Sequence, residues 1–73
     1  MSIKTMADVK RLLEVNYGSI ARFCRDRKMD LYQCRETLNN RRIHAKSIAI
    51  IAHALGIDPQ VLFEIAEREK KAS

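Results

Sequence analysis

Residues 19–42 constrain the fold most, because they carry the signals for two short helices separated by a tight turn. Ser19 is a favourable N-cap for a first helix and Asp30 for a second one. Gln33 follows Asp30 at the spacing of a capping box. Asn39-Asn40 predicts the end of the second helix, because asparagine tolerates the left-handed conformation that often follows a helix.

The rest of the chain predicts three more helices, over residues 6–16, 45–55 and 59–70, and no strand. Gly18 and Gly56 are stop signals, and Asp58-Pro59 places an N-cap before a proline at the first helical position. We expect one all-α domain over residues 1–73, with a core from about 6 to 66 and a poorly ordered lead-in at 1–5. The residues expected to face the core are Val9, Leu12, Leu13, Asn16, Ile20, Phe23, Cys24, Ile43, Ile48, Ile51, Ala52, Leu55, Leu62, Phe63 and Ala66.

The predicted helix at 31–38 has one buried side and one hydrogen-bonding side. Helical periodicity groups Leu31, Cys34, Thr37 and Leu38 on the buried side. The outer side carries Tyr32, Gln33 and Glu36, flanked by Arg35. Such a helix, beside basic residues, suits insertion into a DNA major groove, where Gln pairs with adenine, Glu accepts from cytosine and Arg prefers guanine.

Positive charge supports a polyanionic partner. The net charge is +5, and Arg41, Arg42 and Lys46 follow the predicted reading helix directly. Cations there would neutralise phosphates and release counterions. Ser19, at a helix N-terminus, is a further candidate phosphate contact, and His44, where an N-cap is expected, could touch a phosphate when charged.

Three segments together resemble the Cro/Xre family of helix-turn-helix repressors of phages, plasmids and bacteria. They are Phe23-Cys24, where the family usually has Leu-Ala, TLNNRRI at 37–43, and IAHALGIDPQVLF at 51–63. The resemblance covers residues 7–65. It implies a five-helix lambda-repressor-like domain, with the helix-turn-helix in its second and third helices, and a phosphate contact at Asn39.

The turn departs from the family pattern at two positions. Lys28 stands where the family usually has glycine, and Arg27 stands where an apolar residue is usual. We expect Lys28 to adopt positive φ at a cost of roughly 1 kcal/mol.

The sequence lacks the patterns of an enzyme, a metal site or a cofactor site. His44 and His53 have no partners at metal-ligand spacing. Cys24 and Cys34 fall on predicted core faces, where they could lie near each other, and core packing is preferred over a redox switch. The longest apolar stretch, at 47–57, is too short to span a bilayer and no signal-peptide layout is present, so we expect a cytoplasmic protein without a membrane partner or small-molecule ligand.

Surplus apolar residues predict a homodimer on a palindromic operator. Val61 and Ile65 widen the apolar arc of the last helix to roughly 200°, and Ile50 points away from the core face of its helix. The leading hypothesis is a transcriptional repressor that binds double-stranded DNA. The alternatives are an antitoxin of a toxin–antitoxin pair with the same fold and a helical protein-interaction module without a nucleic-acid role.

Overall fold

Five α-helices account for most of residues 3–72, the part of the chain that the computed structural model describes. They are α1 (Met6–Tyr17), α2 (Ile20–Asp26), α3 (Leu31–Leu38), α4 (Ala45–Leu55) and α5 (Pro59–Ala72). No strand occurs within this range. The all-α prediction is therefore confirmed, with α1 one residue longer than expected and α5 continuing past Lys70.

Side-chain caps begin four of the helices. The Ser19 hydroxyl accepts from the Arg22 N–H at 3.1 Å, and the Asp58 carboxylate accepts from the Gln60 N–H at 2.9 Å. Asp30 caps α3 in the same way, so these three predicted starts are confirmed.

The start of α1 differs from the expected lead-in. Thr5 forms a full capping box with Asp8, in which each side chain accepts a hydrogen bond from the other residue's backbone N–H. The backbone N–H groups of Lys4 and Thr5 hold the pKa of the Asp8 carboxyl below its usual value. Residues 4–5 thus make hydrogen bonds to the first turn of α1 that were not expected of the lead-in, while residues 1–2 lie outside the described part.

Three helices end through the same pair of backbone hydrogen bonds. After α2, Lys28 has φ 55°, its N–H reaches the Arg25 carbonyl, and the Met29 N–H reaches the Cys24 carbonyl. Asn40 (φ 61°) ends α3 and Gly56 (φ 68°) ends α4 with the same pattern. These are Schellman motifs, which satisfy the last carbonyls of a helix. The expected positive φ at Lys28 is confirmed.

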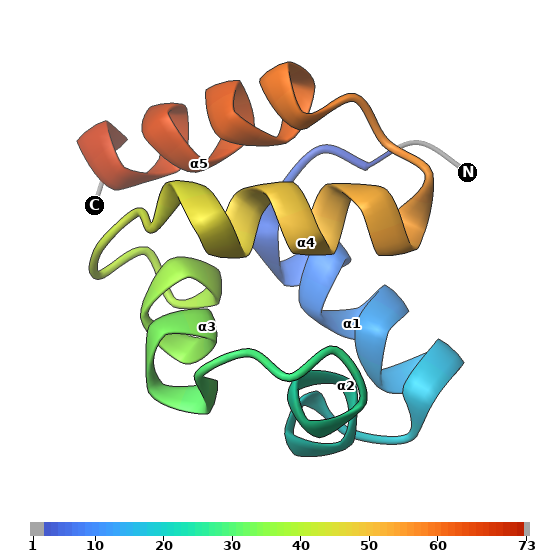
Figure 1. The fold of residues 1–73 in the computed structure, drawn as a ribbon. Helices are drawn as coiled ribbons and strands as arrows, with labels where there is room; N and C mark the ends of the chain where they lie inside the picture. The colour runs from blue at the N-terminus through green and yellow to red at the C-terminus, as the bar shows by residue number, and fades with distance from the viewer. Residues whose placement is uncertain (1–2, 73) are drawn as a thin grey trace.

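All five helices contribute side chains to one core. Figure 1 shows α4 crossing the middle of the molecule, with α5 alongside it on one side and α2 and α3 on the other. The side chains that fill the core are Met6, Val9, Leu13, Ile20, Phe23, Cys24, Cys34, Leu38, Ile48, Ile51, Ala52, Leu62, Ile65 and Ala66. Ser47 and Thr37 are buried with them.

Several core predictions need correction: Leu31, Leu55 and Phe63 are half-buried and pack against the core without being part of it. Asn16 is exposed, and Leu12 is only half-buried, because the buried side of α1 centres on Val9 and Leu13. Ile65, expected outside the core, is 6% exposed. It follows Leu62 by one helical turn and therefore faces the same side of α5.

No helix among residues 3–72 combines the length and the apolar composition needed to cross a membrane. The two cysteines are buried free thiols, and each influences the pKa of the other, so they lie close together, as the sequence allowed. Burial raises the pKa of both thiols, and that of Cys34 to about 12. A thiol of this kind is a packing group with little thiolate character at neutral pH.

Replacing Lys28 with glycine should raise the free energy of unfolding by about 1 kcal/mol, because glycine adopts positive φ without a Cβ clash. For a domain of this size the Tm should rise by ~4–8 °C, measured by circular dichroism. The matched control Lys10→Gly, inside α1, should lower stability by about 1 kcal/mol. An unchanged Tm for Lys28→Gly would contradict the assigned strain.

The raised pKa of Cys34 predicts a loss of stability in alkali. The unfolded thiol ionises near pH ~8.5, whereas the folded one keeps its proton to about 12. Ionisation therefore favours the unfolded chain as the pH rises through this window. Urea unfolding at pH 8 and pH 10 should show that this pH-dependent loss is smaller by about 1–2 kcal/mol in Cys34→Ala than in the wild type. Equal losses in both proteins would contradict the shift.

Candidate nucleic-acid interface

The outer face of α3 is centred on Tyr32. Cys34, Thr37 and Leu38 are buried beneath the helix, which leaves Tyr32 70% exposed on the opposite side. Helical periodicity places Gln33 and Glu36 on the α4 side of Tyr32, and Arg35 and Asn39 on the other side. The helix thus presents all four predicted base-reading residues along one face and its two flanks.

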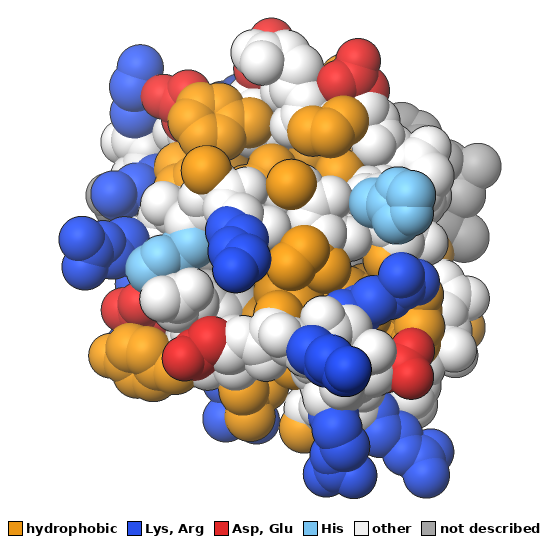
Figure 2. Space-filling view, viewed as in Figure 1, with side chains coloured by type: hydrophobic (Ala, Val, Ile, Leu, Met, Phe, Trp, Pro, Cys, Tyr) orange, Lys and Arg blue, Asp and Glu red, His pale blue; other side chains and the backbone are white. Residues whose placement is uncertain are grey.

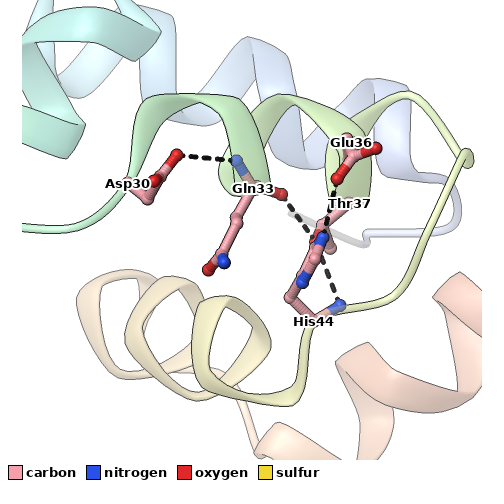
Figure 3. Close-up of polar contacts among 5 residues, drawn as sticks. All are labelled: Asp30, Gln33, Glu36, Thr37 and His44. Atoms are coloured by element: carbon pink, nitrogen blue, oxygen red, sulfur yellow. Dashed lines mark hydrogen bonds and ion pairs between the residues drawn. The ribbon is translucent and has the colours of Figure 1, made fainter.

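The Gln33 side chain is free of the capping role expected for it. Asp30 accepts from the Gln33 backbone N–H at 3.1 Å, but no reciprocal bond from the Gln33 side chain to Asp30 forms. The predicted capping box is therefore only half present. The Gln33 amide points outward from α3 and remains exposed (Figure 3).

Glu36 is less exposed than the sequence suggested. One of its carboxylate oxygens, Oε1, lies 2.9 Å from Nε2 of His44. The side chains of His44 and Glu36 are 18% and 19% exposed. Figure 3 shows the two side chains pointing toward each other across the gap between the end of α3 and the start of α4.

His44 occupies the N-cap position of α4 without capping it through its side chain. Its ring is turned toward Glu36, and its backbone N–H donates to the Thr37 hydroxyl at 3.3 Å. The same hydroxyl donates to the Gln33 carbonyl at 3.0 Å. Thr37 is 1% exposed, so this buried hydroxyl ties the turn before α4 to the middle of α3.

The loop between α3 and α4 is anchored by its backbone, and its cations project into solvent. The N–H groups of Arg41 and Arg42 donate to the Glu36 carbonyl at 2.9 and 3.3 Å. Ile43 is half-buried against the core, as predicted. The side chains of Arg41 and Arg42 in this loop, and of Lys46 in the first turn of α4, are exposed. The fold therefore fixes the position of the backbone that carries these positive side chains and leaves the side chains available to a partner.

Two hollows flank α3, and each contains cations. On one side a hollow of about 410 Å³ is lined by Lys10, Glu14, Ser19, Ile20, Ala21, Arg35, Leu38 and Asn39. On the other side a hollow of about 100 Å³ is lined by Lys28, Met29, Asp30, Gln33, Lys46, Ser47 and Ile50. The predicted phosphate contacts Ser19 and Asn39 come together in the first hollow, and Lys46 lies in the second with Gln33.

The two hollows place three cations, Lys10, Lys28 and Arg35, differently from what the sequence suggested. Arg35 lies with Ser19 and Asn39, away from the α4 side that holds Gln33. Sequence reasoning missed Lys10 and Lys28 as members of this surface, because their distance from the outer face of α3 depends on how separate helices pack. Only the tertiary packing of α1 and α4 beside α3 reveals both.

A second basic region, at the end of α2, was also missed. Arg22, Arg25, Arg27 and Lys28 are all exposed, and four cations within seven positions are visible in the sequence. The Arg27 guanidinium donates to the Tyr17 hydroxyl at 3.0 Å and lies 5.9 Å from the centre of the Tyr17 ring. Figure 2, viewed as in Figure 1, shows Lys and Arg side chains gathered at the left edge and at the lower right, with hydrophobic side chains near the centre and at the top.

The predicted dimer residues separate into two groups. Val61 is 47% exposed and Ile50 is half-buried beside Ala49, His53 and Arg27. Ile65 belongs to the core, so its place in a partner surface is withdrawn. Val15, at 74%, is the most exposed large apolar side chain among the described residues and was not singled out from the sequence.

Comparison of the chain with protein-family models, with curated proteins and with solved structures gives no match. Among residues 3–72, no three His, Cys, Asp or Glu side chains come together in a way that could hold a metal ion.

Proposed function

We propose that this chain is a sequence-specific, double-stranded-DNA-binding transcriptional regulator of the Cro/Xre type, acting as a repressor. In this proposal α2 and α3 form a helix-turn-helix, and α3 lies in the major groove. One observation carries it: α3 presents exposed hydrogen-bonding side chains on a face with cations on both flanks. A major groove has the matching layout, with base edges at its floor and a phosphate strand on each side.

Phosphate contacts would supply most of the affinity. Lys46 lies on the α4 side of the reading helix, Arg41 and Arg42 are exposed in the loop that follows this helix, and Lys10 and Arg35 lie on its other side. Each phosphate neutralised releases condensed counterions, so this part of binding is independent of sequence and sensitive to salt. Arg35 is better placed for a phosphate near Ser19 and Asn39 than for a base.

Base reading would then rest on Tyr32, Gln33 and Glu36. The Gln33 amide makes no hydrogen bond within the described residues, so it can pair with adenine without losing a structural contact. Tyr32, which is 70% exposed, can pack against a thymine methyl or donate to a phosphate. Glu36 can accept from the N4 amine of cytosine.

A homodimer would place two such helices about 34 Å apart, on successive major grooves of a palindromic operator. Val61, with Ile50 as a second residue, remains the candidate contact. Occupation of the operator would block the polymerase.

Alanine substitutions in the loop before α4 and in the first turn of α4 test the proposed phosphate contacts. Changing Arg41, Arg42 or Lys46 to alanine should weaken binding to all duplexes alike and lower the slope of log K against log salt by about 1 each. Fluorescence anisotropy at several salt concentrations measures the slope. Arg11, exposed on the far side of α1, provides the control, and Arg11→Ala should keep the wild-type slope. Unchanged slopes in all three variants would remove the loop and the first turn of α4 from the interface, and an absence of duplex binding by the wild type would refute the function.

Two exposed valines test the dimer. Analytical ultracentrifugation at micromolar concentration should give a dimer for the wild type and a monomer for Val61→Glu, because a carboxylate would be buried without a partner. Val15→Glu is the matched control: Val15 is more exposed than Val61 and should leave the dimer intact. A wild type that is monomeric both alone and on DNA would refute the dimer, and a dimer unaffected by Val61→Glu would exclude this surface.

A further inference from the structure

Glu36 carries a negative charge on the face where DNA phosphates are expected. A free carboxylate there would be repelled by the phosphates and would also lose side-chain entropy when fixed against a base. In the structure, however, the carboxylate is already held. Its Oε1 lies 2.9 Å from His44 Nε2, and both side chains are about four-fifths covered.

His44 is itself fixed in position by contacts that do not involve its ring. Its backbone N–H is bound by the buried Thr37 hydroxyl, which is anchored in turn on the Gln33 carbonyl. His44 also starts α4, whose Ile48 and Ile51 are in the core. The imidazole therefore approaches Glu36 from a rigid support, and it occupies only one of the two carboxylate oxygens. Oε2 has no hydrogen-bond partner among the described residues.

We propose that His44 is the positioning residue for Glu36: its imidazole holds Oε1 and so directs Oε2 toward the N4 amine of a cytosine in the major groove. This inference rests on the proposed DNA-binding function and adds to it the residue that determines specificity at one base pair. In this proposal His44 orients the base-reading side chain of Glu36 and does not itself contact a base. Pre-ordering a side chain in its bound rotamer reduces the entropy lost on binding, and a hydrogen bond to the carboxylate disperses its charge beside the phosphates.

The test compares side chains at position 44 that can and cannot donate a hydrogen bond to Glu36. A binding selection from random duplex DNA first gives the preferred site of the wild type. Glu36→Ala then identifies the base pair that Glu36 reads, as the position where preference disappears. The two informative variants are His44→Gln, whose amide can still donate to Oε1, and His44→Leu, which fills similar space without a donor. His53→Ala is the matched control, since His53 is an exposed histidine on the same helix.

Anisotropy titrations on duplexes that differ only at this base pair should give a sharp pattern. His44→Leu should reduce the preference for cytosine by about tenfold, within the range of one good base contact, and should leave preference at the other positions unchanged. His44→Gln should keep most of the preference, and His53→Ala all of it. Circular dichroism and thermal unfolding establish that each variant is folded, and if His44→Leu is unfolded, His44→Asn, whose shorter amide cannot reach Oε1, takes its place.

Three results would overturn the proposal. The first is full cytosine preference in the variant without a donor. The second is an equal loss of preference at every position, which would mean that His44 only supports the fold of α3. The third is a wild-type preference that survives Glu36→Ala. In each case duplex binding by the wild type would still stand, whereas a wild type that binds no duplex would refute the proposed function and this inference together.

Discussion

The candidate interface depends on the burial of one side of α3. This helix has eight residues, and an isolated helix of that length is unstable in water because nucleation is unfavourable. Cys34, Thr37 and Leu38 bury its inner side against the other helices, and Asp30 satisfies a backbone N–H group at its start. Because the inner side is fixed, the direction of Tyr32 on the outer side is fixed as well. Every residue proposed to meet DNA is placed relative to that helix.

Polar contacts at the end of α3 also fix the position of the basic loop relative to this helix. The Glu36 carbonyl accepts from two loop N–H groups, and the Glu36 carboxylate meets His44. The buried Thr37 hydroxyl connects α3 to His44, the residue that precedes α4. A buried hydroxyl with both a donor and an acceptor partner meets its hydrogen-bonding needs. The loop cations thus have defined positions although their own side chains are exposed.

Local chemistry made most of the helix boundaries predictable. Ser19, Asp30 and Asp58 cap helices through contacts within three residues, and positive φ at Lys28, Asn40 and Gly56 ends them. These interactions involve neighbours in the chain, so the sequence contains all the information that they need. Two errors are local: Thr5 begins α1 with an unpredicted capping box, and the Gln33 amide does not complete the one expected at α3. The other errors concern packing, since Asn16 is exposed and Ile65 is buried. Periodicity gives the direction of a side chain on its own helix but not the depth to which a neighbouring helix covers it.

The sequence by itself determined the five helices, their caps and stops, the side of each that is apolar, and the outer face of α3 with its basic loop. The tertiary structure alone decided which side chains share a surface. It brought Lys10 of α1 beside Asn39 of α3 and Lys28 beside Lys46, and it paired Glu36 with His44. These partners are 8 to 29 positions apart, beyond the reach of helical periodicity. Their proximity follows from the packing of separate helices around one core, where complementary shape selects the arrangement.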